Sequence, residues 1–148
     1  MSTEESKTVV RWMVEHSMIA GDLDAAVAAY APDFVYHNPV LAAMPSLPPG
    51  PEAVRQLVAA TRIAFPDLRY TIEALIAEGD KVAVLYTWQG THQGALGGLP
   101  PTGRQVTATG AIVCRVAGGR IVEQWDVDDR LDVMQQLGLL PPPGQPGP

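Results

Sequence analysis

The chain is poor in the residues on which several classes of protein depend. Its 148 residues include a single cysteine and three histidines. One cysteine cannot form an internal disulfide, and histidines far apart in the sequence offer no metal-binding motif. The 10 lysines and arginines form no cluster and are outnumbered by 16 acidic residues, which gives a formal net charge of -6. That charge disfavours both nucleic acid and anionic lipid as partners.

Long apolar runs are absent as well. No stretch approaches the roughly 20 apolar residues that cross a bilayer. Residues 1–7 are polar and acidic, unlike a signal peptide, so we expect a cytoplasmic protein that does not bind membranes. Residues 141–148 read PPPGQPGP, which has almost nothing to bury and predicts a flexible tail. Residues 1–140 are predicted to form one domain.

The first third of the chain has helical periodicity. A stripe of mostly apolar residues is spaced as on one face of a helix: Val9, Val10, Met13, Val14, Ser17 and Met18. Gly21 ends this helix, and Asp22 is placed to cap a second one whose buried face extends to Tyr30. A short strand is predicted over 34–37, followed by a helix that starts at Pro51.

The remainder alternates as strands do. Strands are predicted over 68–77, 81–92, 104–116 and 120–128, with a closing helix over 131–137. Helices followed by a run of antiparallel strands indicate an α+β fold. A strongly curved sheet of this kind, packed on N-terminal helices, makes a cone whose interior the helices only partly fill.

The strand over 120–128 offers two faces, and alternation alone leaves open which one is buried. One face carries Val122, Gln124, Asp126 and Asp128, and the other carries Ile121, Glu123, Trp125 and Val127. The strand before it has a face of small apolar residues that leaves room inside. The strand over 81–92 mixes aromatic and polar groups on one face, as ligand cavities do.

Three stretches together resemble one known family. The first is PDFVYHNP at 32–39. The second runs from GTHQG at 90–94 to GLPPTGR at 98–104, and the third is GRIVEQWD at 119–126, followed by QLG at 136–138. In this order they resemble the SnoaL-like polyketide cyclases of the NTF2-like superfamily. The resemblance implies the NTF2-like cone enclosing a pocket, and a homodimer or homotetramer that uses the outer face of the sheet.

The resemblance also implies a chemistry. Cyclases of this family close a ring by intramolecular aldol condensation of a polyketide methyl ester, without metal or organic cofactor. Asp126 matches their acid/base position, which would turn it into the pocket. Burial raises the pKa of a carboxyl group, which suits a base that works near neutral pH. The expected ligand is a small hydrophobic molecule with a carbonyl group.

One position departs from the family pattern. Ile112 stands where the polyketide cyclases carry a histidine, so His37 or His92 would have to reach the substrate from another direction. His37 can equally satisfy the loop before Pro39, and His92 can equally bond the loop over 94–103. The side chains expected to contact substrate are Tyr36, Asn38, Phe65, Trp88 and Ile112.

Two classes of function remain open from the sequence. The first is a cofactor-free enzyme of the lyase or isomerase type, either a cyclase or an isomerase, dehydratase or epoxide hydrolase that uses the same carboxylate. The second is a non-catalytic module that binds a small ligand or forms oligomers, since a fold does not determine a function.

Overall fold

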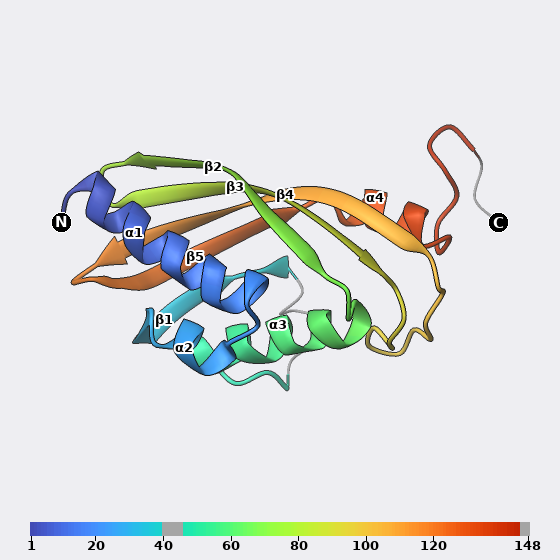
Figure 1. The fold of residues 1–148 in the computed structure, drawn as a ribbon, viewed down its shortest axis with the longest axis horizontal. Coiled ribbons are helices and arrows are strands. Elements are labelled where there is room, and N and C mark those ends of the chain that lie inside the picture. The colour runs from blue at the N-terminus through green and yellow to red at the C-terminus, as the bar shows by residue number, and fades with distance from the viewer. Residues whose placement is uncertain (40–45, 146–148) are drawn as a thin grey trace.

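The computed structural model describes residues 1–39 and 46–145, so residues 146–148 of the expected tail lie outside the described residues (Figure 1). The helices and strands follow one another in this order: α1 (Thr3–Val14), the π-helical turn η1 (Glu15–Ile19), α2 (Leu23–Val27), β1 (Tyr30–His37), α3 (Pro51–Ala64), β2 (Arg69–Glu78), β3 (Lys81–Thr91), β4 (Gln105–Ala117), β5 (Arg120–Asp128) and α4 (Arg130–Gln136). Strands β2 to β5 and helices α3 and α4 agree closely with the predicted ranges.

The strands form a five-stranded sheet with the order β1-β5-β4-β3-β2. Strands β2 to β5 are antiparallel neighbours, whereas β1 lies parallel to β5 at the edge. The sheet arches over α1 and α3, which lie on the same side of it (Figure 1). The predicted α+β class, with helices packed on a curved and mostly antiparallel sheet, is confirmed.

Local sequence explains where the helices begin. The Ser2 side chain accepts a hydrogen bond from the backbone N–H of Glu5, and Asp22 caps α2 in the same way. Pro51 occupies the first turn of α3, where its missing N–H costs nothing. No helix in the described part of the chain is long and apolar enough to cross a membrane.

The core divides into two clusters. The larger one fills the space between α1 and the middle of the sheet, where Val10, Val14, Val84 and Ile121 are almost completely buried. The smaller one lies where α3 ends and contains Phe65, Val106, Ala108 and Leu137. Trp88 packs against both clusters and joins them.

Tyr30 was expected on the buried face of the second helix, and that expectation is wrong. The helix ends at Val27, and Tyr30 begins β1, where it pairs with Ile121. The ring remains buried, at 3% exposure, and its hydroxyl donates to Gln124 Oε1 over 2.8 Å. Pairing with a strand about 90 residues further along decides the conformation here, and no local window of sequence reports such a pairing.

Simple alternation also fails at one point in β5. Val116 pairs with Ile121, but Arg115 pairs with Glu123, so Val122 is an extra residue in the ladder. Such a bulge reverses the alternation. As a result Ile121 and Gln124 are both buried, although the regular pattern assigned them to opposite faces.

We expect Gly94→Ala to destabilise the fold, because Gly94 holds the β3–β4 loop against the end of α3. Its backbone N–H donates to the Ala64 carbonyl over 3.1 Å. A Cβ at this position would overlap the Ile63 carbonyl oxygen, whereas one at Gly98 would meet nothing within 4 Å. Urea unfolding should show a loss of about 1–3 kcal/mol for Gly94→Ala. Equal loss in Gly98→Ala would contradict this account.

Candidate functional site

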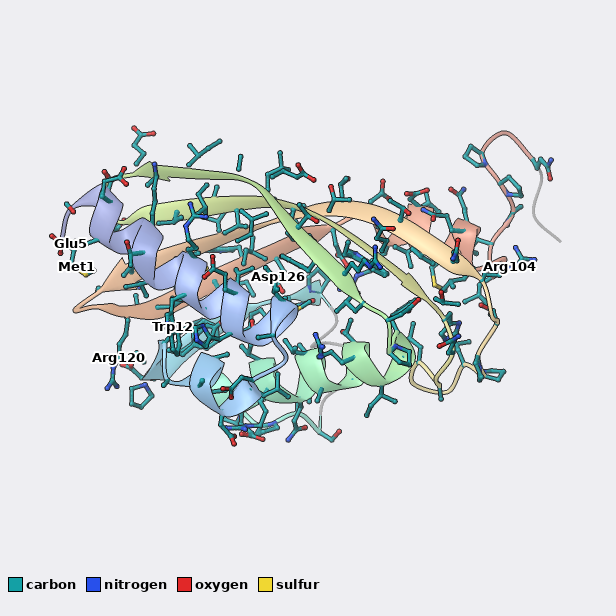
Figure 2. The ribbon with its side chains drawn as sticks, viewed as in Figure 1. Met1, Glu5, Trp12, Arg104, Arg120 and Asp126 are labelled. Atoms are coloured by element: carbon teal, nitrogen blue, oxygen red, sulfur yellow. The ribbon has the colours of Figure 1, made fainter. Side chains whose placement is uncertain are left out.

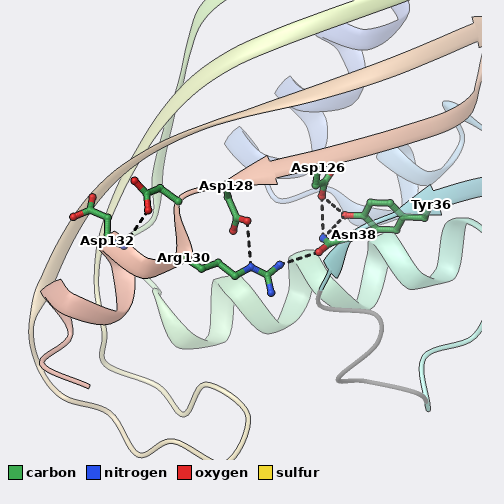
Figure 3. A network of polar contacts seen from close by, with 7 residues as sticks. Tyr36, Asn38, Asp126, Asp128, Arg130 and Asp132 are labelled. Atoms are coloured by element: carbon green, nitrogen blue, oxygen red, sulfur yellow. Dashed lines mark hydrogen bonds and ion pairs between the residues drawn. The ribbon is translucent and has the colours of Figure 1, made fainter. Parts of the chain in front are cut away.

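Asp126 lies at the centre of a cluster of polar side chains on the helix-covered side of the sheet (Figures 2 and 3). Its Oδ2 atom accepts a short hydrogen bond from the Tyr36 hydroxyl and a second one from Asn38 Nδ2 over 3.0 Å. Its Oδ1 atom accepts from Gln124 Nε2 over 2.8 Å. Three donors therefore converge on one partly buried carboxyl group.

Strand pairing brings these residues together. Because β1 runs parallel to β5, Tyr36 lies opposite Gln124, and Asn38 follows at the end of the strand. Residues two apart along an extended chain share a face, so Tyr36 near the end of β1 and Asn38 just after it both reach Asp126. The inward orientation of Asp126, which alternation left open, is the one that the structure shows.

An ion pair extends the cluster towards α4. Arg130 donates from one guanidinium nitrogen to Asn38 Oδ1 over 2.9 Å and from Nε to Asp128 Oδ1 over 3.2 Å (Figure 3). The bond to Oδ1 orients the Asn38 amide so that its NH₂ group faces Asp126 and also lies 3.1 Å from the Tyr36 hydroxyl. Arg130 thereby holds a donor against Asp126 without touching it.

Gln124 is fixed in the same manner from the other side. Its side chain is 4% exposed, and its Oε1 atom accepts the hydrogen bond of the Tyr30 hydroxyl. The amide nitrogen must then face Asp126. Two of the donors to Asp126 are therefore themselves fixed by hydrogen bonds, Asn38 by Arg130 and Gln124 by Tyr30.

Burial raises the pKa of Asp126, and the nearby negative charge of Asp128 raises it further. The hydrogen bonds from Tyr36, Gln124 and Asn38 lower it, but the net shift is upward. Burial, together with the charge of Asp126, also raises the pKa of Tyr36. The raised pKa keeps the Tyr36 hydroxyl protonated, so that it can donate to Asp126.

Apolar and aromatic side chains surround the cluster. Ile112 lies opposite Asp126 in the β4–β5 ladder and is 7% exposed. Tyr70 and Tyr86 stack with their ring centroids 4.6 Å apart, and burial and the charge of Asp126 raise the pKa of both. Tyr70 was not among the residues singled out from the sequence, although the inward face of its strand could have indicated it.

His37 does not meet Asp126. Since Tyr36 points inward, the next residue along the strand points outward. His37 Nε2 lies 2.7 Å from Glu123 Oε2, and its ring stacks on Trp125 with centroids 5.1 Å apart. The expected convergence of His37 with Asp126 inside the protein is therefore absent.

His92 also lies apart from Asp126, in the cluster at the end of α3. It is fully buried, its Nδ1 accepts from the Thr102 N–H over 3.2 Å, and its ring packs on Phe65. Phe65 in turn packs edge-on against Trp88. Of the eight residues expected at the site, the structure gathers Asp126, Tyr36, Asn38 and Ile112 and turns His37 outward. It places His92 with Phe65 at the end of α3, and Trp88 packs between the two regions.

Metal-binding clusters and surface depressions are the other features that could mark a functional site. Across residues 1–39 and 46–145, no three His, Cys, Asp or Glu side chains gather closely enough to hold a metal ion. A polar depression of about 290 Å³ lies at the ends of β2, β3 and β4, with Arg69, Gln89 and Thr107 in its wall. It does not include Asp126.

Comparison with known proteins identifies relatives along most of the chain. The family described as SnoaL-like polyketide cyclase matches residues 7–137. A nogalonic acid methyl ester cyclase from Streptomyces nogalater is 33% identical over 90 residues, which are 60% of this chain and 67% of that protein. The aklanonic acid methyl ester cyclase DnrD from Streptomyces peucetius is 32% identical over 108 residues, 72% of this chain and 70% of that protein.

The fold agrees with this relationship. The crystal structure of AclR, a proposed hydroxylase from Streptomyces galilaeus, superimposes with a TM-score of 0.79 at 31% identity. The match covers 95% of this chain and 85% of AclR. With the family match spanning α1 to α4, the chain belongs to the SnoaL-like polyketide cyclase family.

Proposed function

We propose that this protein is a cofactor-free enzyme that closes a ring in a polyketide methyl ester by intramolecular aldol chemistry, with Asp126 as the acid/base residue. The observation that carries the proposal is the partly buried Asp126 carboxyl group, which has a raised pKa and converging donors. Two similar proteins are cyclases of nogalonic and aklanonic acid methyl esters, which are hydrophobic carbonyl compounds.

The chemistry needs one group that first accepts and then returns a proton. Ionised Asp126 removes a proton from the carbon next to a carbonyl group, and the electron pair delocalises onto oxygen as an enolate. The enolate carbon attacks a second carbonyl carbon in the same molecule, so that a C–C bond forms and an alkoxide appears. Protonated Asp126 then gives its proton to the alkoxide. The product is an isomer of the substrate.

The neighbours of Asp126 suit this cycle. Tyr36, Asn38 and Gln124 donate to the carboxylate and favour its ionised form, which is the base. Burial opposes them and makes the carboxylate more basic than an exposed one. Ile112 supplies no proton donor, so the histidine-dependent arrangement expected of the polyketide cyclases is not available at that position.

Asp126→Asn should abolish turnover and leave the fold intact. Loss of a general acid/base typically costs about 10²–10⁴-fold in rate. The amide keeps the size of the carboxyl group, so unfolding stability should change by no more than about 1–2 kcal/mol. The measurement is chromatography with mass detection on nogalonic and aklanonic acid methyl esters, in which a cyclised product keeps its mass and changes its retention.

Glu123→Gln is the matched control, because Glu123 lies on the same strand and its side chain bonds His37 and Arg115 instead. It should retain wild-type turnover. Full activity in Asp126→Asn would show that Asp126 is not the acid/base residue of the reaction. Tight ligand binding without turnover in the wild-type protein would favour a non-catalytic module.

Tyr36→Phe should move the acidic limb of the kcat/KM profile to higher pH. The ionised form of Asp126 is the base, so activity rises as the pH passes through its pKa. The Tyr36 hydrogen bond lowers that pKa, and its removal should let the pKa rise. Steady-state rates across a pH series measure the midpoint, and a midpoint that stays in place or falls would contradict this role. Glu123→Gln should leave it unchanged.

We also propose that two copies of the chain associate through the outer face of the sheet. Apolar side chains cross this face in register, from Leu85 on β3 through Ala111 to Val127 on β5. Leu85 is 48% exposed and Val127 is 64% exposed. The ion pair of Arg115 with Glu123 lies on the same face, so both charges are available to a copy related by twofold symmetry.

Leu85→Glu should therefore shift the protein to a monomer, because a charge at the centre of an apolar interface is costly to bury. Light scattering after size-exclusion chromatography measures the mass. Ile63→Glu is the control, since Ile63 is also highly exposed but lies on α3. An unchanged mass in Leu85→Glu, or an equal loss in the control, would place the interface elsewhere.

A further inference from the structure

Within the described residues, two tyrosine hydroxyls near Asp126 have no hydrogen-bond partner. The chain contains four tyrosines. Tyr30 and Tyr36 donate to Gln124 and Asp126. Tyr70 and Tyr86, by contrast, form no hydrogen bond with any other residue that the structure describes. Buried tyrosine hydroxyls usually find a partner, so two unpaired hydroxyls side by side call for an explanation.

Neither tyrosine is among the fully buried residues. In the described part of the chain, His92 Nε2 is the one side-chain nitrogen or oxygen that is both enclosed and without a partner. Tyr86 is 8% exposed, and Tyr70 is partly exposed.

Gly110 makes room for Tyr86. A Cβ at Gly110 would overlap the Tyr86 hydroxyl oxygen and lie 2.6 Å from its Cζ atom. The phenol ring therefore lies across the bare backbone of β4 towards β5. Gly110 pairs with Asp128 and Ile112 pairs with Asp126, so the Tyr86 hydroxyl points to the end of β5 that carries these carboxylates.

Tyr70 reaches the same region from β2. It pairs with Trp88, and its ring stacks on Tyr86 at an interplanar angle of 21°. Burial raises the pKa of its hydroxyl, and the charges of Tyr86 and Asp126 raise it further. Burial and the charges of Asp126 and Asp128 do the same for Tyr86. Both phenols thus remain protonated donors next to Asp126.

We propose that the Tyr70 and Tyr86 hydroxyls together bind the substrate oxygen that becomes an oxyanion when Asp126 removes the proton. This inference rests on the proposed function and assigns to two tyrosines the carbonyl-binding task for which Ile112 has no donor. Such donors accelerate a reaction because they are already oriented where negative charge develops.

The step needs no further reactant. The proton moves from substrate carbon to Asp126, and the C–H electron pair becomes the C=C bond of the enolate. The carbonyl π pair moves to oxygen, where the two O–H groups donate without giving up their protons. When the new C–C bond forms, that oxygen becomes a carbonyl again and the donors return to weaker bonds.

Kinetics of Tyr86→Phe and Tyr70→Phe provide the first test, on nogalonic and aklanonic acid methyl esters. Because the bonds strengthen in the transition state, kcat should fall by about 10²-fold in the double variant while KM stays near the wild-type value. Unfolding midpoints should not change, since no hydrogen bond within the described residues is lost. Gly110→Ala should lower kcat as well by displacing the Tyr86 hydroxyl, whereas Gly98→Ala should not.

Thr87→Val is the matched control, because it removes a hydroxyl from the residue next to Tyr86, on the opposite face of β3. It should keep both kinetic constants. Wild-type kcat in the double variant would overturn the proposal and leave the role of Asp126 intact. A rise in KM without a fall in kcat would also overturn it, because it would show uniform substrate binding instead.

A second test needs no turnover. Asp126→Asn imitates the protonated acid that faces the enolate, and 4-nitrophenolate, whose absorbance differs from that of the phenol, imitates the oxyanion. Adding Tyr70→Phe and Tyr86→Phe to Asp126→Asn should weaken phenolate binding about 10- to 100-fold. Equal binding in both proteins would refute the oxyanion site even if the wild-type protein shows no cyclase activity.

Discussion

The parallel pairing of β1 with β5 is the constraint on which the site depends. It places Tyr36 and Asn38 beside Gln124 and Asp126, although about 90 residues separate the two strands. Without that pairing the Asp126 carboxyl group would lack two of its three donors. Burial would then act on it with much less opposition, and the group would be protonated over a wider range of pH.

The side chains that donate to Asp126 are fixed by a second hydrogen bond to another residue. The NH₂ group of Asn38 faces Asp126 and the Tyr36 hydroxyl because Arg130 bonds the amide oxygen. The NH₂ group of Gln124 faces Asp126 because Tyr30 bonds its amide oxygen. The cluster therefore spans β1, β5 and the first residue of α4. Because these side chains are already fixed by hydrogen bonds, they lose little conformational freedom when a substrate binds. The site is in this sense preorganised.

Sequence reasoning succeeded where a local pattern dictates the structure. Pro51 and the periodicity after it define α3, and the turns before Lys81 and Arg120 define the hairpins. Asp126 required the family resemblance as well, because alternation left its direction open. Local patterns could not report the β1–β5 pairing or the bulge at Val122. Each of these depends on contacts between residues distant in sequence, for which no local rule exists.

The bulge at Val122 separates the direction of Asp126 from the length of the strand before it. In a regular strand, losing one residue turns every side chain on one side of the deletion to the opposite face. Here Val122 is the surplus residue, and the ladder from Glu123 to Asp128 keeps its own register with β4. Related chains could shed this residue and still present the same carboxylate to the interior. A change of one residue in the length of β5 at this point therefore leaves the direction of Asp126 unchanged.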